Sequence, residues 1–191
     1  MTRALLAIVF GLALSSLASG CKQQSPEPKA QASGSAASHA PMASTLDAAI
    51  GSTAQLSTMA EAIRQTGLGG VLRGKANYTL FAPTNAAFEK LGQSGRGLRQ
   101  PEQRAAFAAL LREHIVPGML TADDLEKALA RSPGKPLKLR SMGKGTLTVS
   151  RDGGIVTVTG PDGAKATLTS ASAIARNGSV IGIDGVLRKL G

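Results

Sequence analysis

The chain has 191 residues, with 22 basic and 12 acidic side chains and a formal net charge of +10. Hydrophobic residues make up 42%, too many for a wholly disordered chain, and aromatic residues only 3%, which argues against a protein that reads bases by stacking. One cysteine excludes an internal disulfide framework and a zinc site of several thiolates, and two histidines leave little material for a His-rich metal site.

The first 20 residues are expected to be an export signal. Arg3 is the only charge there, and the apolar run from Ala4 to Leu14 has 11 residues, whereas a bilayer span needs about 20. The small residues before Cys21 resemble a bacterial lipobox, which implies that Cys21 is lipidated; an ordinary cleavable signal with a chance cysteine is the alternative. The expected location is therefore the bacterial envelope, at the outer membrane in a Gram-negative cell, or the periplasm or exterior without the lipid.

Residues 21–43 are predicted to be a linker. Seventeen of the 22 residues from Lys22 to Ala43 are Ala, Ser, Pro, Gln or Gly, and Met42 is the only large apolar residue. Such a segment cannot bury enough surface to fold, so we expect a tether that leads to a folded domain over residues 44–191.

The first half of this domain is predicted to be mainly helical. Apolar residues recur at helical spacing from Leu56 to Ile63, and Gly67 is the predicted C-cap. A short buried strand is expected over residues 78–82, where Pro83 stops it.

Further helices are expected after this strand. Thr84 is placed to cap one helix, Pro101 lies in the first turn of another, and Thr121 opens a third with Asp124 in a capping-box position. In the second of these helices, one apolar face is predicted to contain Phe107, Leu110, Leu111, His114 and Ile115.

The second half of the domain changes to a strand period. Residues 146–150 and 155–159 alternate between apolar and polar side chains, with Asp152-Gly153-Gly154 as the turn between them. Two further turns, at Pro161-Asp162-Gly163 and Asn177-Gly178, precede strand-like segments. Helices first and consecutive hairpins later predict the α+β class.

Three ordered blocks then resemble the fasciclin-type domain. They are Thr79–Phe88 (TLFAPTNAAF), Leu111–Gly118 (LREHIVPG) and Asn177–Leu187 (NGSVIGIDGVL). Glu113 stands where the family often has Tyr, and Gly182 where it often has His. The resemblance implies a compact β-sandwich or wedge of short strands flanked by several helices. It assigns structural motif roles to Phe81, Pro83, Thr84, Asn85, Phe88, His114, Pro117, Gly118, Asn177, Gly178 and Asp184.

The same resemblance implies an extracytoplasmic adhesion or interaction module rather than an enzyme, with no catalytic residues, cofactor or metal. His114 is expected to be a neutral ring that bonds a backbone group inside the fold, with a role as a contact residue as the alternative. The linker histidine, His39, is expected to be solvated.

One charged segment stands apart from these motifs. Six basic residues and no acid occupy the 18 positions from Lys127 to Lys144. They form either a solvated face or a contact for an anionic envelope or matrix polymer, and export argues against nucleic acid. The run comprises Lys127, Arg131, Lys135, Lys138, Arg140 and Lys144.

Two functional hypotheses follow. The first is a membrane-anchored interaction or adhesion module with a protein or anionic glycan partner. The second is a periplasmic carrier or sensor that holds a small apolar ligand in a pocket between the helices and the sheet.

Overall fold

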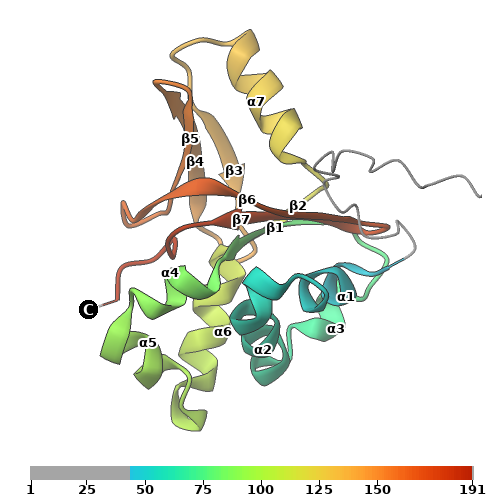
Figure 1. Ribbon diagram of the computed structural model, residues 1–191, viewed down its shortest axis with the longest axis vertical. Coiled ribbons are helices and arrows are strands. Elements are labelled where there is room, and N and C mark those ends of the chain that lie inside the picture. The colour runs from blue at the N-terminus through green and yellow to red at the C-terminus, as the bar shows by residue number, and fades with distance from the viewer. Residues whose placement is uncertain (1–43, 191) are drawn as a thin grey trace, which may run out of the picture. The chain divides into compact units, whose positions relative to one another are not determined.

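The computed structural model describes residues 44–190, whose helices lie mainly in the first half (Figure 1). The predicted signal peptide, the predicted linker with Cys21, and Gly191 lie outside the described residues. Within residues 44–190, no helix is both long enough and apolar enough to span a bilayer. The helices are α1 (Leu46–Gly51), α2 (Ser57–Thr66), α3 (Gly69–Leu72), α4 (Asn85–Glu89), α5 (Gly92–Leu98), α6 (Arg104–Glu113) and α7 (Ala122–Arg131), with short 3₁₀ helices at Ala54–Leu56 and Pro101–Gln103.

Local signals set several helix ends. Thr45, Thr84 and Thr121 each accept a backbone N–H with the side-chain oxygen, at the start of α1, α4 and α7. At α7, Asp124 completes the capping box. α2 ends where Gly67 turns left-handed at φ 75°, a conformation that glycine adopts without the steric cost of a Cβ.

α6 ends earlier than its apolar spacing predicts. The helix stops at Glu113, His114 is its C-cap, and Ile115 already belongs to a strand. The backbone carbonyl of His114 accepts a hydrogen bond from Phe81 N at 2.9 Å, so the chain leaves the helix and joins the sheet at this point. The helical spacing of apolar residues cannot predict this end, because the hydrogen bond joins residues that are far apart in the sequence.

Seven strands form a sheet in the order β2-β1-β7-β6-β5-β4-β3, with β1 and β7 parallel and every other neighbouring pair antiparallel. A register shift in the long strand β6 lies between Leu168 and Ser172, and on either side of it β6 pairs mainly with β5 or with β7. Figure 1 shows β3, β4 and β5 standing away from the β1–β7 layer. The strands are β1 (Tyr78–Pro83), β2 (Ile115–Pro117), β3 (Leu137–Arg140), β4 (Thr146–Asp152), β5 (Ile155–Thr159), β6 (Lys165–Ala175) and β7 (Gly178–Ile183).

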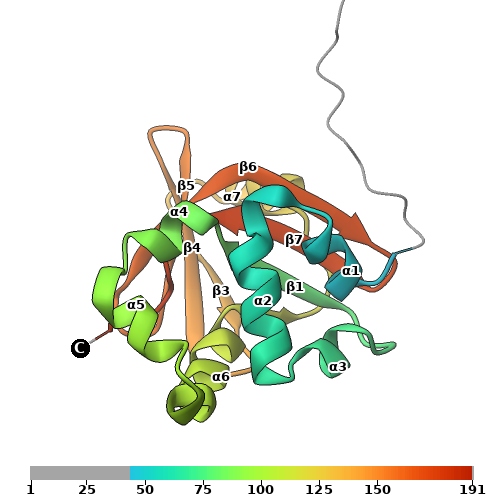
Figure 2. The same cartoon turned by 60° about the horizontal axis from the view of Figure 1, so that its bottom comes forward.

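The central strands separate two hydrophobic cores. Leu80 of β1 and Val180 of β7 pack into the core of the helices α1–α6, whereas Phe81 and Ile181 pack into the core beneath α7. Figures 1 and 2 show these helices and α7 on opposite sides of the central strands. A strand that is buried on both faces does not need polar side chains at alternate positions. This explains why residues 80–82 and 180–183 carry no charged or polar side chain.

The strand β3 has almost no signal in the sequence. This strand has four residues, and only Leu137 and Leu139 alternate with charged neighbours. Two apolar positions are too few to establish a period of two. Pairing with β4 places Leu139 opposite Leu147, which anchors the strand at the edge of the sheet.

Candidate functional site

The three motif blocks meet at His114. The side chain is fully buried, and its Nδ1 lies 3.0 Å from the carbonyl oxygen of Leu110. On the other side of the ring, Leu187 N donates to Nε2 at 3.0 Å. Since Phe81 N also donates to the His114 carbonyl, this residue links all three blocks. Both ring nitrogens have backbone partners, so the ring offers neither to a ligand.

The electrostatics of His114 agree with this geometry. Burial lowers the pKa of the ring from 6.5 to about 4, and the hydrogen bond to Leu110 only partly opposes this effect. The ring is therefore neutral at pH 7, with the proton on Nδ1 and the lone pair of Nε2 facing Leu187 N.

Residues of the closing block also bind other parts of the backbone. The Asn177 side chain accepts a hydrogen bond from Leu46 N at 2.8 Å and donates to Leu72 O and Gly74 O at 2.8 and 2.9 Å. Asp184 accepts from Thr167 N at 2.6 Å. These side chains join the turn before β7 to α1 and α3, and the segment after β7 to β6.

Two glycines of the motifs have identifiable backbone roles: Gly178 allows a close contact between strands, and Gly118 forms a turn. A Cβ on Gly178 would lie 2.1 Å from Tyr78 O, so the parallel approach of β1 and β7 needs glycine there. Gly118, which follows Pro117, turns left-handed at φ 97° and donates to Asn77 O at 2.8 Å.

The residues of the first block, Thr79–Phe88, also make structural contacts. Thr84 caps α4, and Asn85 reaches α2, where its side-chain oxygen accepts Thr58 N at 3.0 Å. Phe81 and Phe88 are buried in the two cores, and Pro83 ends β1. The motif residues thus account for the framework, and the candidate binding surfaces lie elsewhere.

The structure distributes the basic run over several elements. Lys127 and Arg131 are on α7, where Lys127 Nζ pairs with Asp123 at 2.6 Å. Lys135 lies in the loop before β3, and Lys144 lies in the turn after it. Lys138 and Arg140 are both exposed on β3, at alternate positions that share one face of the sheet. The run is therefore not one continuous patch.

Strand register adds a further cation to the β3 pair. Lys138 is opposite Thr148, Thr148 is opposite Thr159, and Thr159 is opposite Lys165, so one row crosses β3, β4, β5 and β6. Neighbouring strands are about 4.8 Å apart, which puts roughly 14 Å between the backbones at the two lysines. We name this surface the basic sheet face and define it by Lys138, Arg140, Thr146, Thr148, Thr159 and Lys165.

The basic sheet face is open to solvent. Lys138, Arg140, Thr146 and Lys165 are exposed, and α7 packs on the opposite side of these strands, over Leu147 and Val149. Within residues 44–190, none of its three cations forms an ion pair. Lys165 lies 21 positions beyond the basic run, so charge clustering along the sequence could not identify it. Only the register of the hairpins over residues 146–169 would have placed Lys165 in the same row as Lys138.

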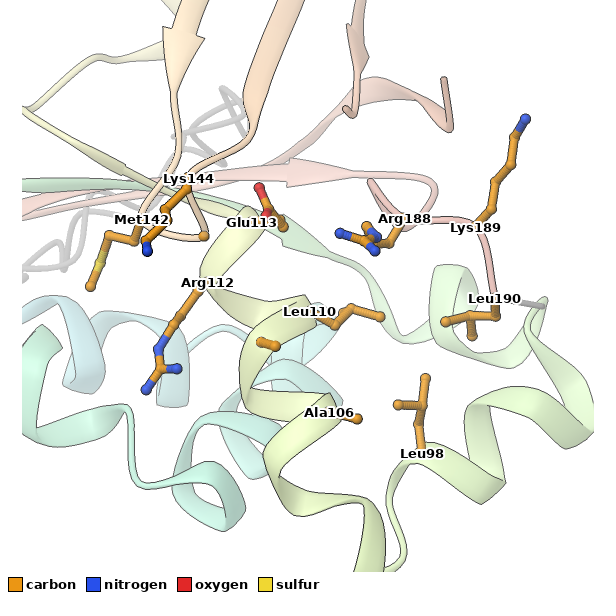
Figure 3. Close-up of a pocket in the computed structure, with 12 residues that line it drawn as sticks. Leu98, Ala106, Leu110, Arg112, Glu113, Met142, Lys144, Arg188, Lys189 and Leu190 are labelled. Atoms are coloured by element: carbon orange, nitrogen blue, oxygen red, sulfur yellow. The ribbon is translucent and has the colours of Figure 1, made fainter. Parts of the chain in front are cut away.

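A pocket of about 500 Å³ is a second candidate site (Figure 3). Its apolar lining comes from α5, α6 and the residues after β7, and includes Leu98, Leu110 and Leu190. Glu113 lies at one end of the pocket, between Lys144 and Arg188 in the view of Figure 3. In the sequence, Glu113 stands out only because it replaces a Tyr of the family motif.

Glu113 is a closely held buried carboxylate. It is 5% exposed, and its Oε2 accepts a hydrogen bond from Ser141 Oγ at 2.5 Å. A Cβ on Gly143 or Gly145 would come within 2.3 Å of its oxygens, so both glycines make room for it. Within the described part of the chain, no residue donates a hydrogen bond to Oε1.

Metal binding finds no support in residues 44–190. No group of three or more His, Cys, Asp or Glu side chains there could hold a metal ion.

The sequence is similar to a known domain family and to known proteins. Residues 54–189 match the family model described as the Fasciclin domain. The transforming growth factor-beta-induced protein ig-h3 of Sus scrofa is 31% identical over 132 residues, which cover 68% of this chain and 17% of that protein. Protein sll1483 of Synechocystis is 31% identical over 132 residues, covering 69% of this chain and 66% of that protein.

A solved structure shares the fold. The FAS1 domain pair of the insect cell adhesion molecule fasciclin I superposes with a TM-score of 0.63 at 16% identity. The match covers 76% of this chain and 51% of that chain. The similarity therefore concerns one domain of larger relatives, and the chain spans only 17% of the ig-h3 protein.

Proposed function

Because the chain belongs to the Fasciclin domain family, whose members are typically adhesion or interaction modules in secreted or extracellular proteins, we propose that it is a non-catalytic envelope module whose basic sheet face binds an anionic polymer. The row Lys138–Thr148–Thr159–Lys165 carries this proposal. It presents two exposed ammonium groups and, between them, the hydroxyl groups of two half-buried threonines, with the exposed Arg140 beside them.

An acidic polysaccharide suits this surface chemically. Its carboxylate or sulfate groups repeat along an extended chain, and its hydroxyl groups both donate and accept hydrogen bonds. An open sheet face offers matching groups over several sugar lengths without a deep pocket. The three cations have no intramolecular acid to displace, so they can turn to a polymer anion without breaking an ion pair within residues 44–190.

The proposed anchor is a lipid on Cys21, with residues 21–43 as the tether. The small residues before Cys21 support this part of the proposal, as does the absence of other cysteines. Two or three acyl chains give a stable anchor, since each buried CH₂ contributes about 0.8 kcal/mol. The proposed location is the outer membrane of a Gram-negative envelope. Replacement of Cys21 by Ala is expected to move the protein from the membrane fraction to the soluble fraction, and retention in the membrane would refute the anchor.

Polymer binding is tested with the full chain, purified in detergent, on immobilised polygalacturonate. The triple variant Lys138→Ala/Arg140→Ala/Lys165→Ala is expected to bind about tenfold more weakly, because three charge contacts of about 0.5 kcal/mol each are removed. Binding should also weaken with salt, since the Debye length falls from about 10 Å at 0.1 M to about 3 Å at 1 M.

The matched control removes three exposed cations from other elements. Lys75, Arg96 and Arg176 lie after α3, on α5 and in the turn between β6 and β7, so Lys75→Ala/Arg96→Ala/Arg176→Ala changes the net charge equally. Equal weakening by both triple variants would show that only total charge matters, and would reject the basic sheet face as the site.

A further inference from the structure

Beyond the proposed polymer contact, we propose that the pocket beside Glu113 binds a single-chain amphiphile whose head carries a primary ammonium and a phosphate. The pocket is lined by residues of α5, α6, the turn between β3 and β4, and the segment after β7. It shares no residue with the basic sheet face, so the two proposals can succeed or fail separately.

The head of the ligand is set by the charged end of the pocket. The Glu113 residue is mostly buried, but its Oε1, to which no residue of 44–190 donates a hydrogen bond, is open to solvent. A solvent-accessible carboxylate oxygen that lines an apolar pocket favours an ammonium, which supplies both a hydrogen-bond donor and a countercharge. A purely anionic head would face Glu113 with a like charge.

Cations around Glu113 define the second group of the head. Lys144 and Arg188 flank Glu113 in Figure 3, whereas the Arg112 side chain lies below Lys144 and extends away from Glu113. Neither Lys144 nor Arg112 forms an ion pair within the described residues, whereas Arg188 is shared with Asp162 at 3.3 Å. An anionic group next to the ammonium therefore finds free cations, and phosphate accepts from several of them.

The backbone holds Lys144 at this position. Lys144 has φ 74°, and it is the only residue other than glycine with a positive φ in the described part of the chain. This conformation is costly for a side chain with a Cβ. The glycines on either side are packed against the Glu113 carboxylate, so the turn that carries Lys144 is formed around Glu113.

The apolar end of the pocket requires a tail on the ligand. Leu98, Leu110, Leu190 and Ala106 lie below the charged end in Figure 3. A volume of about 500 Å³ is within the usual range for small-molecule sites. One acyl chain would cover these side chains, and a head without a chain would leave them in water.

The test measures binding of lysophosphatidylethanolamine with a 12-carbon chain, below its critical micelle concentration, by isothermal titration calorimetry on the full chain carrying Cys21→Ala, which needs no detergent. Sodium laurate, which has the same chain length and no ammonium, is the comparison ligand. We expect Glu113→Gln to weaken lysophosphatidylethanolamine about tenfold and to leave laurate unchanged or tighter. If laurate binds the wild type as tightly as lysophosphatidylethanolamine, the ammonium contact is wrong.

A second variant protects the test from loss of folding at Glu113. Ala106 is exposed on α6 and lines the pocket, so Ala106→Trp should block the apolar end without disturbing the core. Ala105, the preceding residue, is exposed on the same helix outside the pocket lining, and Ala105→Trp is the matched control. Loss of binding in Ala106→Trp alone supports the site, and equal binding by both variants, or no binding by the wild type, overturns the proposal.

Discussion

His114 and Glu113 are adjacent in the sequence, and both are buried, yet their hydrogen bonding differs. The two ring nitrogens of His114 are used by Leu110 and Leu187, at the point where all three motif blocks meet. Glu113 has one oxygen held by Ser141 and the other without a donor in the described part of the chain. The difference separates the motif residues, which maintain the fold, from the residues of the proposed binding sites, which the family motifs do not specify.

The largest expected effect breaks the framework at the parallel strand pair. A Cβ on Gly178 would lie 2.1 Å from the Tyr78 carbonyl oxygen, and backbone cannot move aside as a side chain can. Gly178→Ala should therefore lower the free energy of unfolding by about 4 kcal/mol or more, measured by urea denaturation. Gly51→Ala is the control, since a Cβ there meets nothing within 4 Å. Equal stability of the two variants would contradict the register of β1 and β7.

His114→Ala should have the next largest effect. It removes two buried hydrogen bonds and leaves a cavity, which together cost about 2–4 kcal/mol. For a domain of this size the melting temperature should fall by about 5–15 °C, measured by circular dichroism. The neighbouring Arg112 is exposed, and Arg112→Ala should change the melting temperature little. An unchanged melting temperature in His114→Ala would remove the framework role of His114.

The pH dependence of stability tests the same histidine. Its pKa is about 4 in the folded state and about 6.5 when unfolded, so between these values the unfolded chain binds the proton more readily. The stabilisation is fully present above pH 6.5 and is lost as pH falls toward 4, by up to about 3 kcal/mol. Urea midpoints of wild type and His114→Gln should converge toward low pH. A parallel pH profile for the two proteins would refute a neutral buried ring.

The smallest expected effect concerns the turn at Lys144. Lys144→Gly should raise the free energy of unfolding by about 0.5–1 kcal/mol, because glycine adopts a positive φ without strain. Lys144→Ala removes the same charge but keeps the Cβ, so it should bring no such gain. If both variants gain equally, relief of backbone strain is not the cause.

The sequence predicted the framework better than the sites. Local signals at Gly67, Thr84 and Thr121 identified helix ends, because each acts within one turn of the chain. The parallel pairing of β1 and β7 joins residues 100 positions apart, and no local period encodes it. The α+β class was correctly predicted because helical and strand periods occupy different halves.

The candidate sites depend on pairing across strands and between distant segments. Lys165 joins Lys138 only through the register of three strand pairs. The surroundings of Glu113 depend on Gly143 and Gly145, which lie 30 and 32 positions later in the chain. In the sequence these glycines do not indicate a contact with Glu113, because the contact forms only when the turn packs against the carboxylate. Residue type and spacing alone therefore suggested a continuous basic run, whereas the structure divides its members between a sheet face, a helix, a loop and a pocket.

The separation of framework from binding surface is tested most directly by the affinity of His114→Ala for polygalacturonate, measured at 10 °C where circular dichroism shows the variant still folded. We expect a Kd within about twofold of wild type, since His114 is fully buried and uses both ring nitrogens internally. A tenfold loss of affinity in the folded variant would instead place the motif centre within the binding site.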